Sequence, residues 1–131
     1  MERDRDSLAG ILMEIKRGEV YSTNLLDKDS RGNEIGKKRP ALVIQADTWN
    51  ELLPSTIVVP LTSQMPIYIS AGTVTINQGV AGVEKDSNIL FSQMRSVDKS
   101  RLEKRIGKLP EGKMKAVDKA LSLTLGLERV D

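Results

Sequence analysis

GKKRPALVIQ (residues 36–45) and STIVVPLTSQ (residues 55–64) are the two stretches that decide the fold. Each joins an apolar run of strand length to polar side chains at one end, which predicts a buried strand with functional groups at its end. Pro40 has no N–H, which suits the first position of a strand, and it holds Arg39 in an extended conformation. A second proline interrupts the other strand shortly before Thr62. If the two strands are neighbours, a guanidinium and a hydroxyl converge on one anion, which predicts a phosphate site.

The composition limits the chemistry that the chain can perform. Its 131 residues fit one domain, and its 20 basic and 18 acidic residues give a net charge of +2. Affinity for nucleic acid must therefore come from local clusters of charge. The chain has no cysteine and no histidine, so it lacks thiolate catalysis, zinc–thiolate sites and the usual general base. We predict no metal site and no cofactor.

The same composition bears on location and on nucleic-acid recognition. Aromatic residues make up only 3% of the chain, which argues against a platform that stacks several bases. No apolar run reaches the roughly 20 residues that span a bilayer. The start of the chain carries mixed charges and does not resemble a secretory signal. We expect no membrane association and a cytoplasmic location.

Hydrophobic periodicity divides the chain into an extension and one domain. Residues 1–14 predict a short helix or a partly ordered arm, and residues 15–131 predict a single domain. Strands are predicted over 16–25, 41–44, 56–59, 73–76, 87–97 and 103–109. Pro110 opens a helix whose apolar stripe is expected to lie on the sheet. That stripe comprises Met114, Val117, Leu121 and Leu125. We therefore predict a mainly β fold, a small barrel or strongly bent antiparallel sheet with a C-terminal helix.

Shorter segments carry further expectations. Residues 47–54 read as a single turn in which Trp49 and Leu53 plug the core. Asp98 is a good N-cap for a short turn through residue 102. In the run 87–97, Gln93 and Arg95 share one face of the predicted strand. The polar loop 27–38 reads either as a solvated connection or, because of its length, as a functional segment.

The order of several short motifs resembles the MazF/PemK/Kid family of toxin ribonucleases. The motifs lie at residues 16–21, 32–34, 39–40, 60–64, 86–90, 93–98 and 113–118. The resemblance covers residues 15–127 and implies an SH3-like barrel with a C-terminal helix, assembled as a homodimer. It also implies metal-independent cleavage of single-stranded RNA at short sequences. The family's partner is an antitoxin with an acidic, partly disordered tail.

The resemblance also implies site residues. The arginine of the family's Arg-Pro motif falls on Arg39 and its strand-end threonine on Thr62, and the acidic residue of the preceding loop falls on Glu34. We predict Arg39 and Thr62 as catalytic and Glu34 as a supporting residue. The predicted RNA-binding residues are Lys37, Lys38, Ser63, Gln64, Gln93 and Arg95. One departure is Ser92, which stands where some members carry an acidic residue, so a carboxylate role there does not transfer.

Physical chemistry assigns roles to these groups. RNA cleavage by its own 2′-hydroxyl needs a proton acceptor, a proton donor and stabilisation of the charged phosphorane. Arg39 suits transition-state charge because its fork matches phosphate oxygens, and proton donation to the leaving group is a further option. Thr62 is expected to orient the phosphate. The proton acceptor is either Glu34 or water. Gln93 and Arg95 either contact bases or backbone, or form a surface pair.

Two other functional classes fit parts of the sequence. A poison of DNA gyrase resembling the CcdB type shares the barrel fold but does not need the Arg39 and Thr62 pair. A catalytically silent barrel that binds RNA or peptide would show salt-dependent RNA binding without cleavage. RNA digestion separates the ribonuclease from the other two classes, and RNA binding without cleavage identifies the silent barrel.

Overall fold

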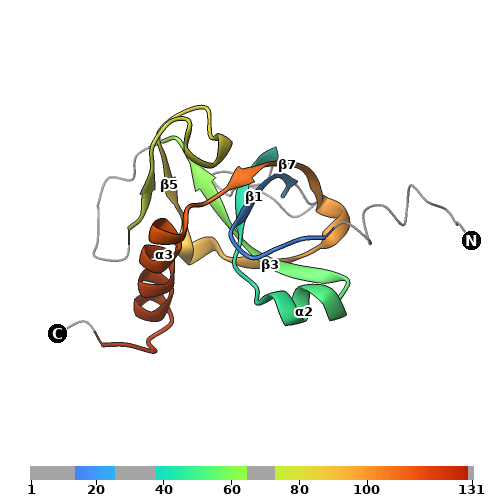
Figure 1. Ribbon diagram of the computed structural model, residues 1–131. Helices are drawn as coiled ribbons and strands as arrows, with labels where there is room; N and C mark the ends of the chain where they lie inside the picture. Colours follow the sequence, from blue (N-terminus) through green and yellow to red (C-terminus); the bar gives the residue numbers. More distant parts are fainter. Residues whose placement is uncertain (1–13, 26–37, 65–72, 130–131) are drawn as a thin grey trace, which may run out of the picture.

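The computed structural model describes residues 14–25, 38–64 and 73–129. They form a strongly curled antiparallel sheet with α3 beside one part of it and α2 beside another (Figure 1). The predicted fold class is therefore confirmed. Residues 1–13 of the predicted helix or arm, residues 27–37 of the polar loop and residues 65–72 lie outside the described part of the chain.

Seven strands pair in the order β4-β5-β3-β2-β1-β7, and β6 pairs with β3 off this path. The strands are β1 (Glu19–Asn24), β2 (Lys38–Val43), β3 (Ser55–Thr62), β4 (Thr75–Ile76), β5 (Ser87–Ile89), β6 (Arg95–Asp98) and β7 (Leu102–Lys108). The helices are α2 (Asp47–Leu52) and α3 (Glu111–Thr124), with 3₁₀ turns η1 (Val80–Gly82), η2 (Phe91–Gln93) and η3 (Lys99–Arg101). Asp98 caps η3 as predicted by accepting a hydrogen bond from the Ser100 N–H, which also lowers the pKa of its carboxyl.

The two central strands bury both faces, which explains their continuous apolar runs. In β2, Leu42 packs in one cluster while Ala41 and Val43 pack in another. The first cluster comprises Val20, Leu42, Val59, Leu61, Val74, Ile76, Val83, Ile89, Phe91, Leu109, Val117 and Ala120. The second comprises Ile15, Tyr21, Leu25, Ala41, Val43, Val58, Val97 and Leu102. Burial on both faces fixes the register, since a one-residue shift would exchange the clusters.

The two prolines occupy different places from those predicted. Pro40 is the third residue of β2, paired with Ser22, and the β2–β3 ladder begins only after it, at Ala41. Pro60 remains inside β3. It marks a change of partner, because β3 pairs with β6 as far as Val58 and with β5 from Leu61 onward. On the side of β3 that faces β6 and β5, the missing N–H therefore falls between two ladders, while on the other side Pro60 pairs with Ala41 of β2.

The predicted strand over residues 87–97 is wrong. β5 ends at Ile89, η2 follows, and β6 begins at Arg95. The alternating pattern suggested one continuous strand because Phe91, which lies in the 3₁₀ turn η2, is buried as a strand residue would be. As a result, Gln93 and Arg95 lie on different elements and share no strand face.

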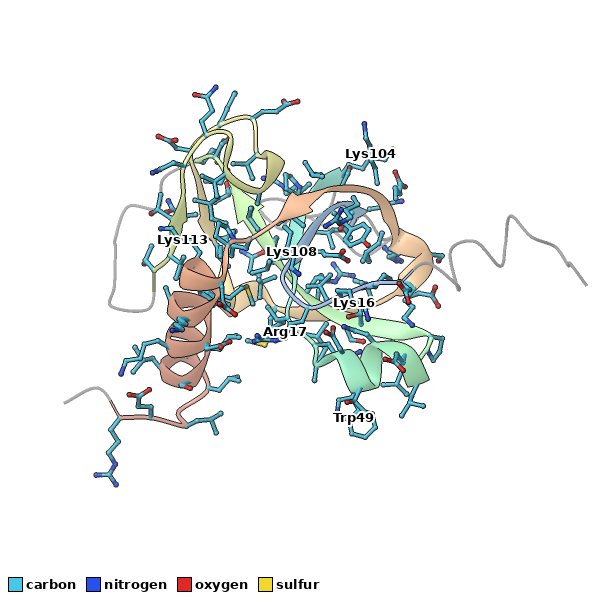
Figure 2. The ribbon with its side chains drawn as sticks, viewed as in Figure 1. Lys16, Arg17, Trp49, Lys104, Lys108 and Lys113 are labelled. Atoms are coloured by element: carbon cyan, nitrogen blue, oxygen red, sulfur yellow. The ribbon has the colours of Figure 1, made fainter. Side chains whose placement is uncertain are left out.

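The C-terminal helix forms as predicted. Val117 and Ala120 are buried in the first cluster, with Met114 and Leu121 packed against it. Arg17 fastens the helix to the strands: its Nη2 donates to Asp118 Oδ1 at 2.7 Å and its Nε to the Ile44 carbonyl at 2.7 Å (Figure 2). Leu125 departs from the predicted stripe. It lies beyond the last helical residue and is 54% exposed.

Helix α2 presents apolar side chains to solvent, which corrects the prediction that Trp49 and Leu53 plug the core. Trp49 is 54% exposed and Leu53 39% exposed, and Trp49 points away from the sheet (Figure 2). Asn50 takes the buried position instead. Its side chain accepts hydrogen bonds from Gln45 Nε2 and Thr56 Oγ1 and donates to the Gln45 carbonyl. A satisfied polar network therefore holds this helix in place of an aromatic plug.

Turn η1 packs directly against β7, with no room for an extra methyl group. A Cβ on Gly107 would lie 2.5 Å from the carbonyl carbon and oxygen of Ala81, and one on Gly82 would overlap the Ile106 carbonyl oxygen. Gly82 also has a φ of 79°, and Ala81 a φ of 54°. These contacts join two segments that are 25 residues apart along the chain. Within the described residues, no helix is long and apolar enough to cross a membrane.

Candidate active site

A pocket of about 680 Å³ opens where the ends of β2 and β3 meet β7 and the segment after η1. Strand β2 contributes Lys38, Arg39 and Pro40, and the end of β3 contributes Leu61, Ser63 and Gln64. The opposite side is formed by Gly82, Val83, Glu84, Lys85 and Ser87, together with Ser22, Lys104 and Ile106 of β1 and β7. The start of β2 and the end of β3 therefore line one pocket.

Arg39 is half-buried in β2, where Thr23 of β1 lies opposite it. Its Nε is buried and has no hydrogen-bond partner within the described residues. A buried N–H without an acceptor costs about 1–3 kcal/mol, so native proteins rarely leave one unpaired. This donor is shielded from solvent, so a ligand would contact Arg39 through the other guanidinium nitrogens.

Thr62 lies on the strand next to Arg39. The β2–β3 ladder ends at the pair of Ala41 with Pro60, so Arg39 and Thr62 each lie two residues beyond this pair on their own strands. The Thr62 hydroxyl oxygen accepts a hydrogen bond from the Gln64 N–H at 3.1 Å. Thr62 is 8% exposed and does not line the pocket itself, whereas Ser63 and Gln64 are exposed and do. The hydroxyl therefore shapes the turn that brings these two residues to the pocket.

The charge that lines the pocket is mainly positive. Its charged residues are Lys38, Arg39, Lys85, Lys104 and Glu84, which are four cations and one carboxylate. Lys38 is already engaged, since its Nζ lies 2.8 Å from Glu103 Oε1. Lys104 and Lys85 are exposed and form no ion pair with any described residue. The pocket thus suits a polyanion.

The structure separates the predicted RNA-binding residues into three groups. Lys38, Ser63 and Gln64 line the pocket with Arg39. Gln93 and Arg95 do not, and Arg95 Nη1 donates to the Leu25 carbonyl at 3.2 Å. Lys37 lies outside the described residues, as does Glu34, the predicted supporting residue. The roles assigned to these residues stay predictions.

Sequence reasoning missed the far side of the pocket. Lys104 lies in β7, opposite Ser22 of β1, and Lys85 follows η1. Both lie in segments that were predicted only as a strand and as a connection. Because pairing of β1 with β7 joins residues about 80 positions apart, no local signal reveals it.

Glu19 is a buried carboxylate with a structural role. Glu19 is 6% exposed, and its oxygens accept from the Lys16 N–H at 2.8 Å and the Tyr21 hydroxyl at 2.9 Å and pair with Arg105 Nε at 2.8 Å. Burial raises the pKa of the Tyr21 hydroxyl above its usual value, and the hydrogen bond to Glu19 raises this pKa further. Neither group is available as a base, because Glu19 is paired with Arg105 of β7 and the Tyr21 hydroxyl donates to Glu19.

Comparison with known proteins identifies the family. A family model described as PemK-like, MazF-like toxin of type II toxin-antitoxin system matches residues 16–125. The chain belongs to this family. A curated MazF-family relative, the endoribonuclease MazF of Staphylococcus epidermidis, is 38% identical over 117 residues, covering 89% of this chain and 96% of the relative. The resemblance drawn from the motifs is therefore confirmed.

Solved structures agree on the fold. The MazF of Deinococcus radiodurans has a TM-score of 0.69 at 26% identity, covering 86% of this chain and 96% of that one. An endoribonuclease from Mycobacterial species has a TM-score of 0.70 at 18% identity, covering 89% and 96%. A MazE–MazF complex from Deinococcus radiodurans scores 0.66 at 23% identity, covering 87% and 98%. The last two similarities support the MazF-type fold alone.

Proposed function

We propose that this protein is a sequence-specific endoribonuclease toxin that cleaves single-stranded messenger RNA in the cytoplasm without a metal ion. The 2′-oxygen attacks the adjacent phosphorus, the bond from phosphorus to the 5′-oxygen breaks, and the products carry a 2′,3′-cyclic phosphate and a 5′-hydroxyl. The 2′-hydroxyl loses its proton and the leaving oxygen gains one. Family membership and the 38% identical endoribonuclease support the reaction class.

The observation that carries the proposal is Arg39, a half-buried cation that lines a pocket together with three further cations. Cleavage places extra negative charge on the phosphorane oxygens, and donors fixed in advance stabilise that charge most effectively. Arg39 cannot act as an ordinary base, because the guanidinium pKa is roughly 12 or higher. We assign it to transition-state charge, with proton donation to the leaving oxygen as a second role.

A general base is still needed for the 2′-hydroxyl. Glu34 is the proposed acceptor, since the family motif places an acidic residue at this position, and water is the alternative. Replacing Glu34 by glutamine separates the two. If Glu34 is the base, the rate loses its rise with pH near the carboxyl pKa of about 4.3. If the variant keeps the parent's pH profile, water accepts the proton.

Thr62 is proposed to hold the scissile phosphate against Arg39. The Thr62→Val variant keeps the shape of the side chain but removes the hydroxyl, and we expect about a 10- to 100-fold loss in single-turnover rate, the value of one hydrogen bond to a charged group. The Thr62→Ser variant should stay within a few-fold of the parent, because it retains the hydroxyl. Equal rates for parent and Thr62→Val would remove Thr62 from the mechanism.

Digestion of a sequence-diverse RNA tests the function itself. Purified protein is incubated with a labelled transcript pool, and the 5′ ends of the fragments are sequenced. The proposal predicts cuts at a short recurring sequence, and the motif found supplies the substrate for every later assay. No cleavage of any transcript, with salt-dependent RNA binding retained, would instead identify a silent RNA-binding barrel.

We further infer a homodimer and an antitoxin with an acidic C-terminal segment. The pocket's excess of cations supports an acidic partner, and the MazF of Deinococcus radiodurans has been solved with MazE. An acidic peptide is expected to compete with RNA for the pocket, so its apparent affinity should fall as RNA is added. Independent binding of the two would contradict a shared site. Light scattering of the purified protein tests the dimer.

A further inference from the structure

We propose that Asn88 of β5 is a positioning residue for RNA cleavage. Together with Thr75 of β4 it fixes the side chain of Thr62, which is proposed to hold the scissile phosphate. This inference rests on the proposed function and deepens the part that Thr62 plays in it. The sequence motifs gave no role to Asn88 or Thr75. Three features of the described residues support the inference.

The first feature is a row of polar side chains across three neighbouring strands. Thr62 of β3 pairs with Asn88 of β5, and Asn88 pairs with Thr75 of β4. Directly opposed residues of an antiparallel sheet share a face, with their Cβ atoms about 4.5–5.5 Å apart. The amide of Asn88 therefore lies between the two threonine side chains. Thr75 Oγ1 donates to Asn88 Oδ1 at 2.7 Å, which fixes the amide from one side.

This row lies on the face of the sheet that also carries Arg39. Side chains alternate along a strand, so Arg39 shares a face with Ala41, and Thr62 shares a face with Val58. Ala41 and Val58 both belong to the second cluster. Arg39 and Thr62 thus stand on the same face of two neighbouring strands, and Asn88 continues that face on the next strand.

The second feature is a buried amide at a position that suits an apolar side chain. Asn88 is completely buried, and Thr62 opposite it is 8% exposed. Asparagine is disfavoured in strands, and a buried amide lowers stability unless it is hydrogen-bonded. A β-branched apolar residue would suit this place in β5 better on both counts. The amide is therefore explained by its effect on the residue opposite, which is Thr62.

The third feature is the hydrogen bonding of Thr62 and the anchoring of the row. The Thr62 hydroxyl oxygen accepts from the Gln64 N–H, and no described residue accepts the hydroxyl hydrogen. That hydrogen can therefore be donated to a phosphate oxygen if the side chain is held in one orientation. The far end of the row is fixed, because Lys113 Nζ of α3 donates to the Thr75 carbonyl at 2.9 Å.

A double-mutant cycle between Asn88 and Thr62 tests the inference. The single-turnover rate of cleavage is measured at saturating motif oligonucleotide for the parent, Asn88→Val, Thr62→Val and the combined variant. The dissociation constant is measured with the same oligonucleotide carrying 2′-O-methyl at the attacking position, which binds but cannot be cut. Ile89→Val is the matched control, because Ile89 is buried next to Asn88 in β5 but packs in the first cluster.

We expect Asn88→Val to lower the rate about 3- to 10-fold, the value of one hydrogen bond between uncharged groups. The affinity for RNA should stay close to the parent's, because the buried amide does not touch the ligand. In the Thr62→Val background, Asn88→Val should cause no further loss, since no hydroxyl remains to be positioned. Ile89→Val should have the same small effect on the rate in both backgrounds.

A further variant separates cleavage from folding. Asn88→Val leaves the Thr75 hydroxyl without its acceptor, which should lower the denaturation midpoint. Replacing both Asn88 and Thr75 by valine removes donor and acceptor together, so the midpoint should return toward the parent's. This double variant should still cleave as slowly as Asn88→Val. Parental cleavage by the stable double variant would overturn the inference.

The remaining outcomes distinguish the inference from the proposed function. If Asn88→Val lowers the rate equally in both backgrounds, Asn88 does not act through Thr62, and the inference fails while the proposed function stands. If Thr62→Val cleaves as fast as the parent, Thr62 leaves the mechanism and the inference falls with that assignment. If the parent cuts no RNA, the proposed function fails and the inference fails with it.

Discussion

Replacing Arg39 by alanine is expected to lower the single-turnover rate of RNA cleavage by about 10²- to 10³-fold, the usual cost of removing one donor aimed at transition-state charge. The substitution also removes a buried N–H that has no partner within the described residues. We therefore expect the free energy of unfolding to change by less than about 1 kcal/mol, since the lost packing of the side-chain stem is offset by the lost desolvation cost. Rapid-quench cleavage assays and thermal unfolding measure the two quantities.

The lysine variant sharpens this test. Arg39→Lys keeps the positive charge but loses the planar fork that matches phosphate oxygens. We expect it to bind RNA about as well as the parent and to cleave at close to the alanine rate. A variant that cuts at the parental rate, with either residue, would show that Arg39 is not the charge-stabilising group. Lys108 is exposed and does not line the pocket, so Lys108→Gln serves as the control for surface charge.

Replacing Gly107 by alanine should produce the largest loss of stability. The added Cβ would lie 2.5 Å from the backbone of Ala81, so η1 must move away from β7. Overpacking of this kind costs about 1–3 kcal/mol and more when only backbone is available to yield. Because η1 leads into the side of the pocket that carries Lys85, the affinity for RNA should fall as well.

Gly112 provides the matched control for this experiment. It lies in the first turn of α3, and a Cβ there would meet no atom within 4 Å. Gly112→Ala should raise the free energy of unfolding by up to about 1 kcal/mol, because alanine loses less backbone entropy in a helix. Chemical denaturation compares the two variants. Equal stability of Gly107→Ala and Gly112→Ala would show that η1 and β7 are not in tight contact.

Much of the fold was predictable because its strongest signals are local. The apolar runs of β2 and β3 mark strands buried on both faces, and the stripe from Met114 to Leu121 marks a helix with one buried face. The pairing of the strands that carry Arg39 and Thr62 was predictable for the same reason. Their strands are neighbours in the sheet, and the register of these strands follows from burial.

The failures have physical causes too. Trp49 was expected in the core because large aromatics usually bury, yet Asn50 and its hydrogen bonds hold α2 instead. The run 87–97 keeps an alternating pattern through η2, so periodicity alone could not detect the turn. Lys104 and Lys85 reach the pocket only through contacts between distant segments. Those contacts depend on how the whole sheet curls, which no local pattern encodes.

The end groups of the cleaved RNA test the central claim most directly. A labelled oligonucleotide that carries the cleavage motif is digested in excess EDTA, and the fragment ends are determined by mass spectrometry. Attack by the 2′-hydroxyl, with charge stabilised by Arg39, predicts undiminished cleavage that yields a 2′,3′-cyclic phosphate and a 5′-hydroxyl. Cleavage that stops in EDTA and returns with Mg²⁺, or fragments with a 5′-phosphate and a 3′-hydroxyl, would contradict this mechanism.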